Sequence, residues 1–219
     1  MPRALFEKTG KAIYISHLDL MRVFQRSFKR AGLPLTHSQG FNPRPSVSIA
    51  LPLSVGVESC CELLDFEPEG EKVPCDQIQD RLNAALVEGV RVLDVYDDAA
   101  KIKQLAYLDC LVTLEYDAGI PECADEKIRA LFAREEVLVE KKSKNGVREE
   151  NIIPMIRSVK VSAPDANTLE LTARVCCQNP TLNPAQLTAA IERYLPELSP
   201  DFSRCRRLEI YDTEETIFR

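Results

Sequence analysis

The order in which two kinds of apolar periodicity alternate along the chain constrains its fold more than any other feature. A period of two residues is typical of a half-buried strand, and a period near 3.6 is typical of an amphipathic helix. Residues 1–100 show the order strand, helix, strand, strand, helix, strand. The segments are residues 5–15 (interrupted by a Thr9-Gly10 turn), 16–32, 46–53, 61–66, 76–89 and 90–96. This half is therefore predicted to be β-α-β-β-α-β.

The second half repeats this order and adds one hairpin between its two helices. Its segments are residues 107–116, 125–133, 137–142, 147–153, 156–162, 169–177, 183–195 and 206–211. The hairpin turn is predicted at Lys144-Asn145-Gly146, because Asn-Gly favours a tight connection between antiparallel strands. The last helix is predicted to begin at Asn183, a capping residue that is followed by Pro184.

Two successive halves of this kind predict an α+β protein with two tandem ferredoxin-like halves and antiparallel sheets. We expect the N-terminal half to cover residues 1–100 and the C-terminal half to cover residues 104–219. A short polar linker joins them between residues 97 and 104. The 219 residues are sufficient for both halves to have a real core.

The helix predicted at residues 16–32 is bounded by local signals at both ends. Ser16 suits the N-cap, and the Asp19 carboxylate is expected to bind the backbone amide of Ser16. Gly32 suits the left-handed closing position, and Pro34 prevents continuation. One face of the helix is apolar. The opposite face carries four residues that we call the basic stripe: Arg22, Arg26, Lys29 and Arg30.

The segment His37–Pro45 follows this helix and contains a glycine and two prolines, which predict an ordered turn or loop. Its side chains suit ligand contact, because they combine amides, a hydroxyl, an imidazole and a guanidinium with one aromatic ring. The candidate binding residues are His37, Ser38, Gln39, Phe41, Asn42 and Arg44. Residues 46–53 then alternate as a strand, and Pro52 places that strand at a sheet edge or marks its end.

The run from residue 15 to residue 59 reads ISHLDLMRVFQRSFKRAGLPLTHSQGFNPRPSVSIALPLSVGVES. It resembles the N-terminal signature of a bacterial family of unknown function, the radical-SAM-associated domain. Members of that family are fused to, or encoded beside, a radical S-adenosylmethionine protein. The match is dense over the first quarter of the chain and thin beyond it. The resemblance implies a radical S-adenosylmethionine protein as partner, and it implies no particular activity.

Charge is distributed unevenly along the chain, although the net charge is only −6. Residues 1–57 contain eight basic and two acidic side chains, whereas residues 58–219 contain 20 basic and 32 acidic ones. A cationic N-terminal surface on an acidic body indicates a specific acidic partner rather than general adhesiveness.

The basic stripe and the loop favour RNA, because clustered guanidiniums bind backbone phosphates and Phe41 can stack on a base. Gln39 or Asn42 could then bind a base edge. Alternatives remain open for both features. The stripe could be an ordinary solvated helix face or bind an acidic protein, and the loop could be a connection shaped by Gly40 and Pro43.

The two histidines, His17 and His37, are the candidates for catalysis. A neutral imidazole beside arginines could act as a general base on a ribose hydroxyl. Tandem ferredoxin-like halves are similar to the layout of CRISPR repeat-processing endoribonucleases, but this chain lacks the Gly-rich C-terminal loop of that group. A local structural role for His17 is the alternative.

Eight cysteines are present, but none of their spacings forms a C-x-x-C or a radical-SAM cluster motif. We therefore expect no metal and no cofactor. No apolar run approaches the length of about 20 residues of a membrane span, and the segment MPRALFEKTG contains no apolar h-region, so we expect no secretion signal. We expect a cytoplasmic protein without membrane contact.

These observations together predict a non-catalytic accessory module that binds RNA or presents a substrate to a separate radical S-adenosylmethionine protein. A metal-independent endoribonuclease with a histidine general base is the first alternative. A scaffold that binds only protein is the second.

Overall fold

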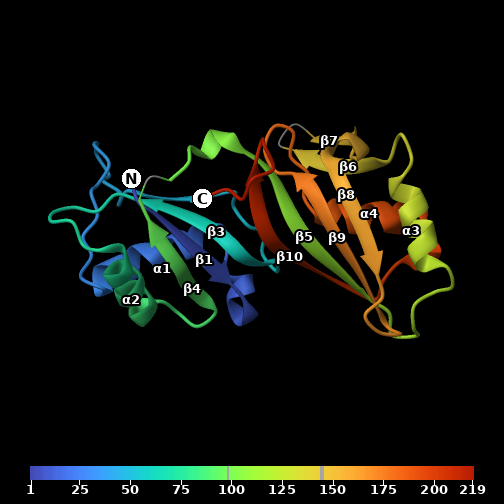
Figure 1. Cartoon of the computed structure of the whole chain (residues 1–219), viewed down its shortest axis with the longest axis horizontal. Coiled ribbons are helices and arrows are strands. Elements are labelled where there is room, and N and C mark those ends of the chain that lie inside the picture. The colour runs from blue at the N-terminus through green and yellow to red at the C-terminus, as the bar shows by residue number, and fades with distance from the viewer. Residues whose placement is uncertain (98, 144–145) are drawn as a thin grey trace. The chain divides into compact units, whose positions relative to one another are not determined.

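The computed structural model describes residues 1–97, 99–143 and 146–219. Contacts between residues divide it into two compact units (Figure 1). The N-terminal unit consists of Met1–Gln104 with Phe218–Arg219, and the C-terminal unit is Leu105–Ile217. The linker residue Asp98 and the predicted turn residues Lys144 and Asn145 lie outside the described residues.

The N-terminal unit has one antiparallel sheet in the order β4-β1-β3-β2 and two α-helices. Its elements are β1 (Arg3–Lys8), η1 (Gly10–Tyr14), α1 (His17–Arg30), β2 (Val47–Ala50), β3 (Glu58–Phe66), α2 (Cys75–Ala85), β4 (Val90–Tyr96) and η2 (Ile102–Gln104). This order of strands, with each helix connecting strands that are not neighbours, is the ferredoxin-like topology.

Two strand predictions in this unit extend too far. The segment after Thr9 forms the 3-10 helix η1, because Gly10 has a φ of +55° and turns the chain out of the strand. Strand β2 stops at Ala50, and Leu51 has a φ of +48°. Pro52 follows without an N–H group to donate, so the ladder with β3 cannot continue.

The core of the N-terminal unit lies between the sheet and both helices. Phe24 of α1 packs edge-on against Phe6 of β1, with ring centroids 4.8 Å apart, and Phe28 lies 4.9 Å from Phe66 of β3. Leu82 of α2 belongs to the same buried cluster. The two helices therefore cover the same face of the sheet.

The C-terminal unit has the equivalent topology, with strands in the order β10-β5-β9-β8, all antiparallel (Figure 1). Its elements are β5 (Leu105–Glu115), α3 (Ala124–Phe132), β6 (Leu138–Ser143), β7 (Gly146–Asn151), η3 (Ile153–Met155), β8 (Ile156–Ser162), β9 (Thr168–Cys176), α4 (Ala185–Tyr194), η4 (Pro196–Leu198) and β10 (Phe202–Asp212). The additional hairpin, β6 and β7, forms a separate two-stranded sheet. The α+β class with two ferredoxin-like halves and antiparallel sheets is confirmed.

Alternation along β5 shows how this sheet is oriented. Leu108, Cys110, Val112 and Leu114 are buried, whereas the residues between them are partly exposed. Every second side chain therefore belongs to the core, and the others line a helix-free face. Within the described part of the chain, no helix is long and apolar enough to span a membrane.

Candidate functional site

The N-terminus of α1 is closed by reciprocal contacts between Ser16 and Asp19. The Ser16 hydroxyl oxygen accepts from the Asp19 backbone N–H at 3.2 Å and donates to Asp19 Oδ2 at 2.7 Å. Asp19 Oδ1 accepts from Arg22 at 2.7 Å. The carboxylate thus binds the Ser16 hydroxyl, where the sequence predicted the Ser16 amide. The hydrogen bonds from Ser16 and Arg22 hold the pKa of Asp19 below its usual value.

The C-terminus of α1 forms a Schellman motif, as the glycine signal indicated. Gly32 has a φ of +66°, and its N–H donates to the carbonyl oxygen of Lys29 at 3.3 Å. The N–H of Leu33 donates to the carbonyl oxygen of Phe28 at 3.0 Å. These bonds fix the direction in which the chain leaves the helix toward the loop at residues 37–45.

The four residues of the basic stripe are all exposed, but they are not equivalent. Arg22 forms an ion pair with Asp19. Arg30 donates to the backbone carbonyl oxygen of Ala85, at the end of α2, and to Ser27 Oγ at 3.0 Å. Among the residues that the structure describes, Arg26 and Lys29 make no side-chain hydrogen bond and no ion pair.

The segment His37–Pro45 is a closed, hydrogen-bonded loop. The N–H of Ser46 donates to the carbonyl oxygen of Thr36 at 2.8 Å, and His37 forms a β-bridge with Pro45. Nearer the tip, the N–H of Ser38 donates to the carbonyl oxygen of Arg44 at 2.9 Å, and Ser38 Oγ accepts from the Arg44 N–H at 3.0 Å. The loop is therefore ordered by its own backbone.

The tip of this loop is fully accessible to solvent. All residues from Ser38 to Arg44 are exposed, and Phe41 is fully exposed to solvent. The Arg44 guanidinium has no acidic partner in residues 1–97, 99–143 and 146–219. The structure thus brings one apolar ring, two amides and an unpaired cation together on one short segment.

The two histidines lie on separate elements. His17 is the first residue of α1 and is partly buried, whereas His37 is exposed at the base of the loop. Within the described residues, neither imidazole forms a hydrogen bond with a carboxylate or a hydroxyl. A histidine base is normally oriented by such a partner, and this arrangement lacks one.

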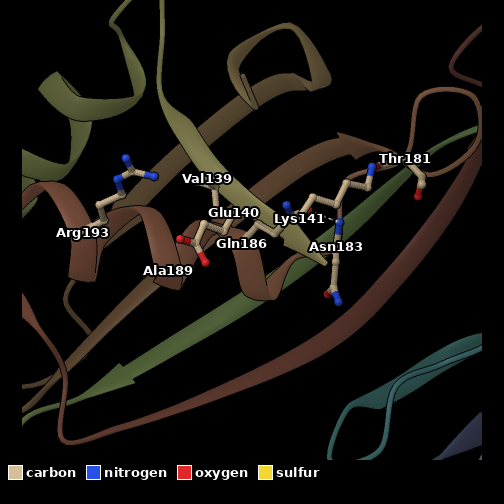
Figure 2. A pocket seen from close by; sticks show the side chains of 8 residues that line it. All are labelled: Val139, Glu140, Lys141, Thr181, Asn183, Gln186, Ala189 and Arg193. Carbon is tan, nitrogen blue, oxygen red and sulfur yellow. Dashed lines mark hydrogen bonds between the residues drawn. The ribbon is translucent and has the colours of Figure 1, made fainter. Parts of the chain in front are cut away.

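Two clefts of the C-terminal unit were missed by the sequence analysis. The larger, about 820 Å³, lies between β6 and α4 (Figure 2). Arg193 lies toward one end of it and Thr181 toward the other (Figure 2). Gln186, Ala189 and Arg193 share one face of α4. Their i, i+3, i+7 spacing is visible in the sequence and could have indicated that they line a common surface. The smaller cleft, about 430 Å³, lies on the helix-free face of the sheet.

The cations of the larger cleft are already paired. Lys141 Nζ donates to Glu150 Oε2 at 2.7 Å and to the carbonyl oxygen of Thr181 at 3.2 Å. Arg193 donates to Glu149 Oε1 at 2.6 Å. This cleft therefore offers little uncompensated positive charge to a ligand.

Half of the eight cysteines are part of the core. Cys61, Cys110, Cys176 and Cys177 are buried, and burial raises the pKa of Cys177 to about 11. In the described part of the chain, no three His, Cys, Asp or Glu side chains are grouped so that they could hold a metal ion.

The fold and the site define a class of α+β protein with two ferredoxin-like units, an exposed basic helix face and a projecting loop. The chain belongs to a family of uncharacterized proteins conserved in bacteria (DUF2344), and the family profile matches residues 2–184. No curated protein matches the chain.

Solved structures with a similar fold include a chain of a Cbf5-Nop10-Gar1 complex. It has a TM-score of 0.53 and 10% sequence identity over 95% of this chain, which covers 48% of that chain. A chain of the archaeal box H/ACA sRNP Nop10-Cbf5 complex has a TM-score of 0.46 and 11% identity over 94% of this chain, which covers 46% of it. This protein thus spans about half the length of each of these two chains, and the likeness to the first concerns the fold alone.

Proposed function

We propose that this protein is a non-catalytic module that binds single-stranded RNA through the loop His37–Pro45 and through Arg26 and Lys29 of the basic stripe. The observation that carries the proposal is the full exposure of Phe41 on a loop whose ends are tied by hydrogen bonds. An aromatic ring that is fully exposed to solvent contributes nothing to the stability of the fold. It is well suited to stack on an unpaired base, which is worth about 1–3 kcal/mol.

Three cations of the N-terminal unit that have no acidic partner among the described residues supply contacts for the RNA backbone. Arg26, Lys29 and Arg44 are exposed and have no acidic partner in the described residues. Guanidinium and ammonium groups bind phosphate oxygens by charge-assisted hydrogen bonds. The amides of Gln39 and Asn42 provide donors and acceptors for a base edge.

Two further properties favour binding at this surface. The loop is already ordered, so little conformational entropy is lost when it contacts a ligand. Residues 58–219 contain 20 basic and 32 acidic side chains, so that part of the chain repels phosphate on average. A polyanion is thereby directed to the N-terminal 57 residues.

We also propose that the module presents its RNA to a separate radical S-adenosylmethionine protein. This partner is taken from the sequence resemblance at residues 15–59 alone. The contact between the two proteins could be made by Arg26 and Lys29 of the basic stripe or by the larger cleft of the C-terminal unit.

The test is the binding of a fluorescently labelled, unstructured oligoribonucleotide, measured by anisotropy at several salt concentrations. Three phosphate contacts on a single strand predict a slope of about −2 in log K against log salt. Phe41→Ala should weaken binding about 5- to 150-fold. Phe202→Ala, which removes an exposed ring in the C-terminal unit, is the matched control and should bind like the wild type.

Three outcomes would contradict the proposal. RNA that is not retained at low salt leaves the protein-binding scaffold as the better interpretation. Binding that ignores Phe41→Ala means that the loop is only a connection. Cleavage of the RNA in chelator that is lost in His17→Ala or His37→Ala would instead establish the endoribonuclease.

A further inference from the structure

The smaller cleft of the C-terminal unit lies on the helix-free face of its sheet and has a volume of about 430 Å³. It brings together three basic side chains and two hydroxyls in a unit that is acidic as a whole. The residues that line it are Asp109, Arg157, Ser158, Lys160, Thr172, Arg174 and Glu215. Residues 105–217 contain 14 basic and 20 acidic side chains, so a local group of basic residues here is unexpected.

The register of β8 and β9 places four of these residues in a compact square. Ser158 lies opposite Arg174, and Lys160 lies opposite Thr172. Side chains directly opposite in an antiparallel pair are about 5 Å apart at Cβ and point to the same face. Two hydroxyls and two cations therefore alternate around one small area of the sheet.

Arg174 is held rigidly as one wall of the cleft. Its guanidinium donates to both carboxylate oxygens of Asp109, at 2.8 and 2.9 Å, and to Glu215 Oε2 at 2.8 Å. It also lies over the ring of Tyr211, 3.9 Å from the centroid. The Tyr211 hydroxyl donates to Asp109 at 2.9 Å. Both carboxylates in the cleft are thus engaged by Arg174 and are not available to another cation.

Arg157 and Lys160 are different, because neither forms an ion pair within the part of the chain that the structure describes. The Arg157 guanidinium lies over the ring of Tyr107, 4.8 Å from its centroid, and donates to the Tyr107 hydroxyl. It is thereby oriented before any ligand binds. Lys160 is exposed and lies two residues after Ser158 in β8, so the two side chains are on the same face of the sheet.

We propose that this cleft binds a phosphate group through Arg157, Lys160 and the hydroxyls of Ser158 and Thr172. A phosphate accepts several hydrogen bonds at once, and a guanidinium, an ammonium and two hydroxyls supply donors of the required kinds. The orientation of Arg157 by Tyr107 lowers the entropic cost of binding. The site lies in the other unit from Phe41 and does not depend on the proposed RNA function.

The phosphate could come from an RNA backbone or from a small phosphorylated compound, and the first experiment needs neither. The full chain is titrated with inorganic phosphate at constant ionic strength, and binding is followed by isothermal calorimetry. Lys160→Ala and Arg157→Ala should each weaken binding about three- to tenfold. Arg204→Ala is the matched control, because it removes an exposed guanidinium of the same sheet that is already paired with Glu115.

The titration overturns the proposal if phosphate does not saturate the protein, or if Arg204→Ala weakens binding as much as Lys160→Ala does. Arg157→Lys and Lys160→Gln replace the alanine variants if the thermal melts of the latter show unfolding.

A second arm distinguishes the two sources of the phosphate. With a labelled single-stranded oligoribonucleotide, Lys160→Ala should reduce the salt slope by about 0.7 if the site binds the RNA backbone. An unchanged slope assigns the site to a small phosphorylated compound. A complete lack of RNA binding would contradict the proposed function while leaving the phosphate titration interpretable.

Discussion

The Arg30 guanidinium of α1 donates a hydrogen bond to the backbone carbonyl oxygen of Ala85, the last residue of α2. Ser27 Oγ donates to the same oxygen at 3.1 Å and accepts from Arg30 at 3.0 Å. The carbonyl groups at the end of a helix have no partner within the helix, so these contacts satisfy one of them. They also tie the two helices of the N-terminal unit together.

Arg30→Ala should therefore lower the free energy of unfolding by about 1–2 kcal/mol, since a charged donor is lost from a carbonyl oxygen. Its effect on RNA affinity should be small. Arg26→Ala is the matched variant on the same helix: it should change stability by less than about 0.5 kcal/mol and should weaken RNA binding. Urea denaturation and anisotropy measure the two effects. A loss of RNA affinity in Arg30→Ala together with a loss of stability in Arg26→Ala would show that Arg30, and not Arg26, binds the RNA.

Two phenylalanines of the N-terminal unit should behave in opposite ways. Phe24 is fully buried against Phe6, so Phe24→Ala should destabilise the protein by about 3–5 kcal/mol. Phe41→Ala should leave stability within about 0.5 kcal/mol of the wild type, because its ring contacts nothing that is lost on unfolding. Both changes in the free energy of unfolding follow from the shifts of the urea midpoints, provided that the dependence of that free energy on urea concentration is the same for both variants and the wild type. A large loss of stability in Phe41→Ala would mean that the loop packs in solution.

The ion pair of Arg3 with Asp65 should behave as a buried pair. Arg3 Nε and Nη2 donate to the two carboxylate oxygens at 2.6 and 3.1 Å, and the guanidinium lies 5.3 Å from the centroid of Phe218. Arg3→Ala should cost about 3–5 kcal/mol, because it leaves a carboxylate poorly solvated. Adding Asp65→Ala should recover part of this loss. Equal, additive losses in a double-mutant cycle would show that the two groups do not interact.

The hairpin of β6 and β7 should weaken in acid. The hydrogen bond from Lys141 holds the pKa of Glu150 below its ordinary value of 4.5, and Arg148 adds to the effect. A depressed pKa in the folded state means that the unfolded state binds the proton more readily. The contribution of Glu150 is then complete above about pH 4.5 and is lost as the pH falls through the lower folded value. Thermal melts of the wild type should show this loss, and melts of Glu150→Gln should show a flatter acid limb. Identical acid limbs would disprove the assignment.

The sequence alone determined the features that depend on neighbours along the chain. Periodicity set the order β-α-β-β-α-β in both halves, since local repeats decide which face of an element is apolar. The caps at Ser16 and Gly32 were readable because they involve residues within one helical turn. The basic stripe was visible for the same reason.

Only the tertiary structure decided which of these residues are free to bind. Arg30 bonds to Ala85, which is 55 residues away, so nothing near Arg30 in the sequence distinguishes it from Arg26. The square of Ser158, Lys160, Thr172 and Arg174 exists only through the register of β8 on β9. Strand pairing joins distant segments through backbone hydrogen bonds that every residue except proline can make. Such pairing leaves little local trace in the sequence, and for that reason the smaller cleft of the C-terminal unit exists only in the folded chain.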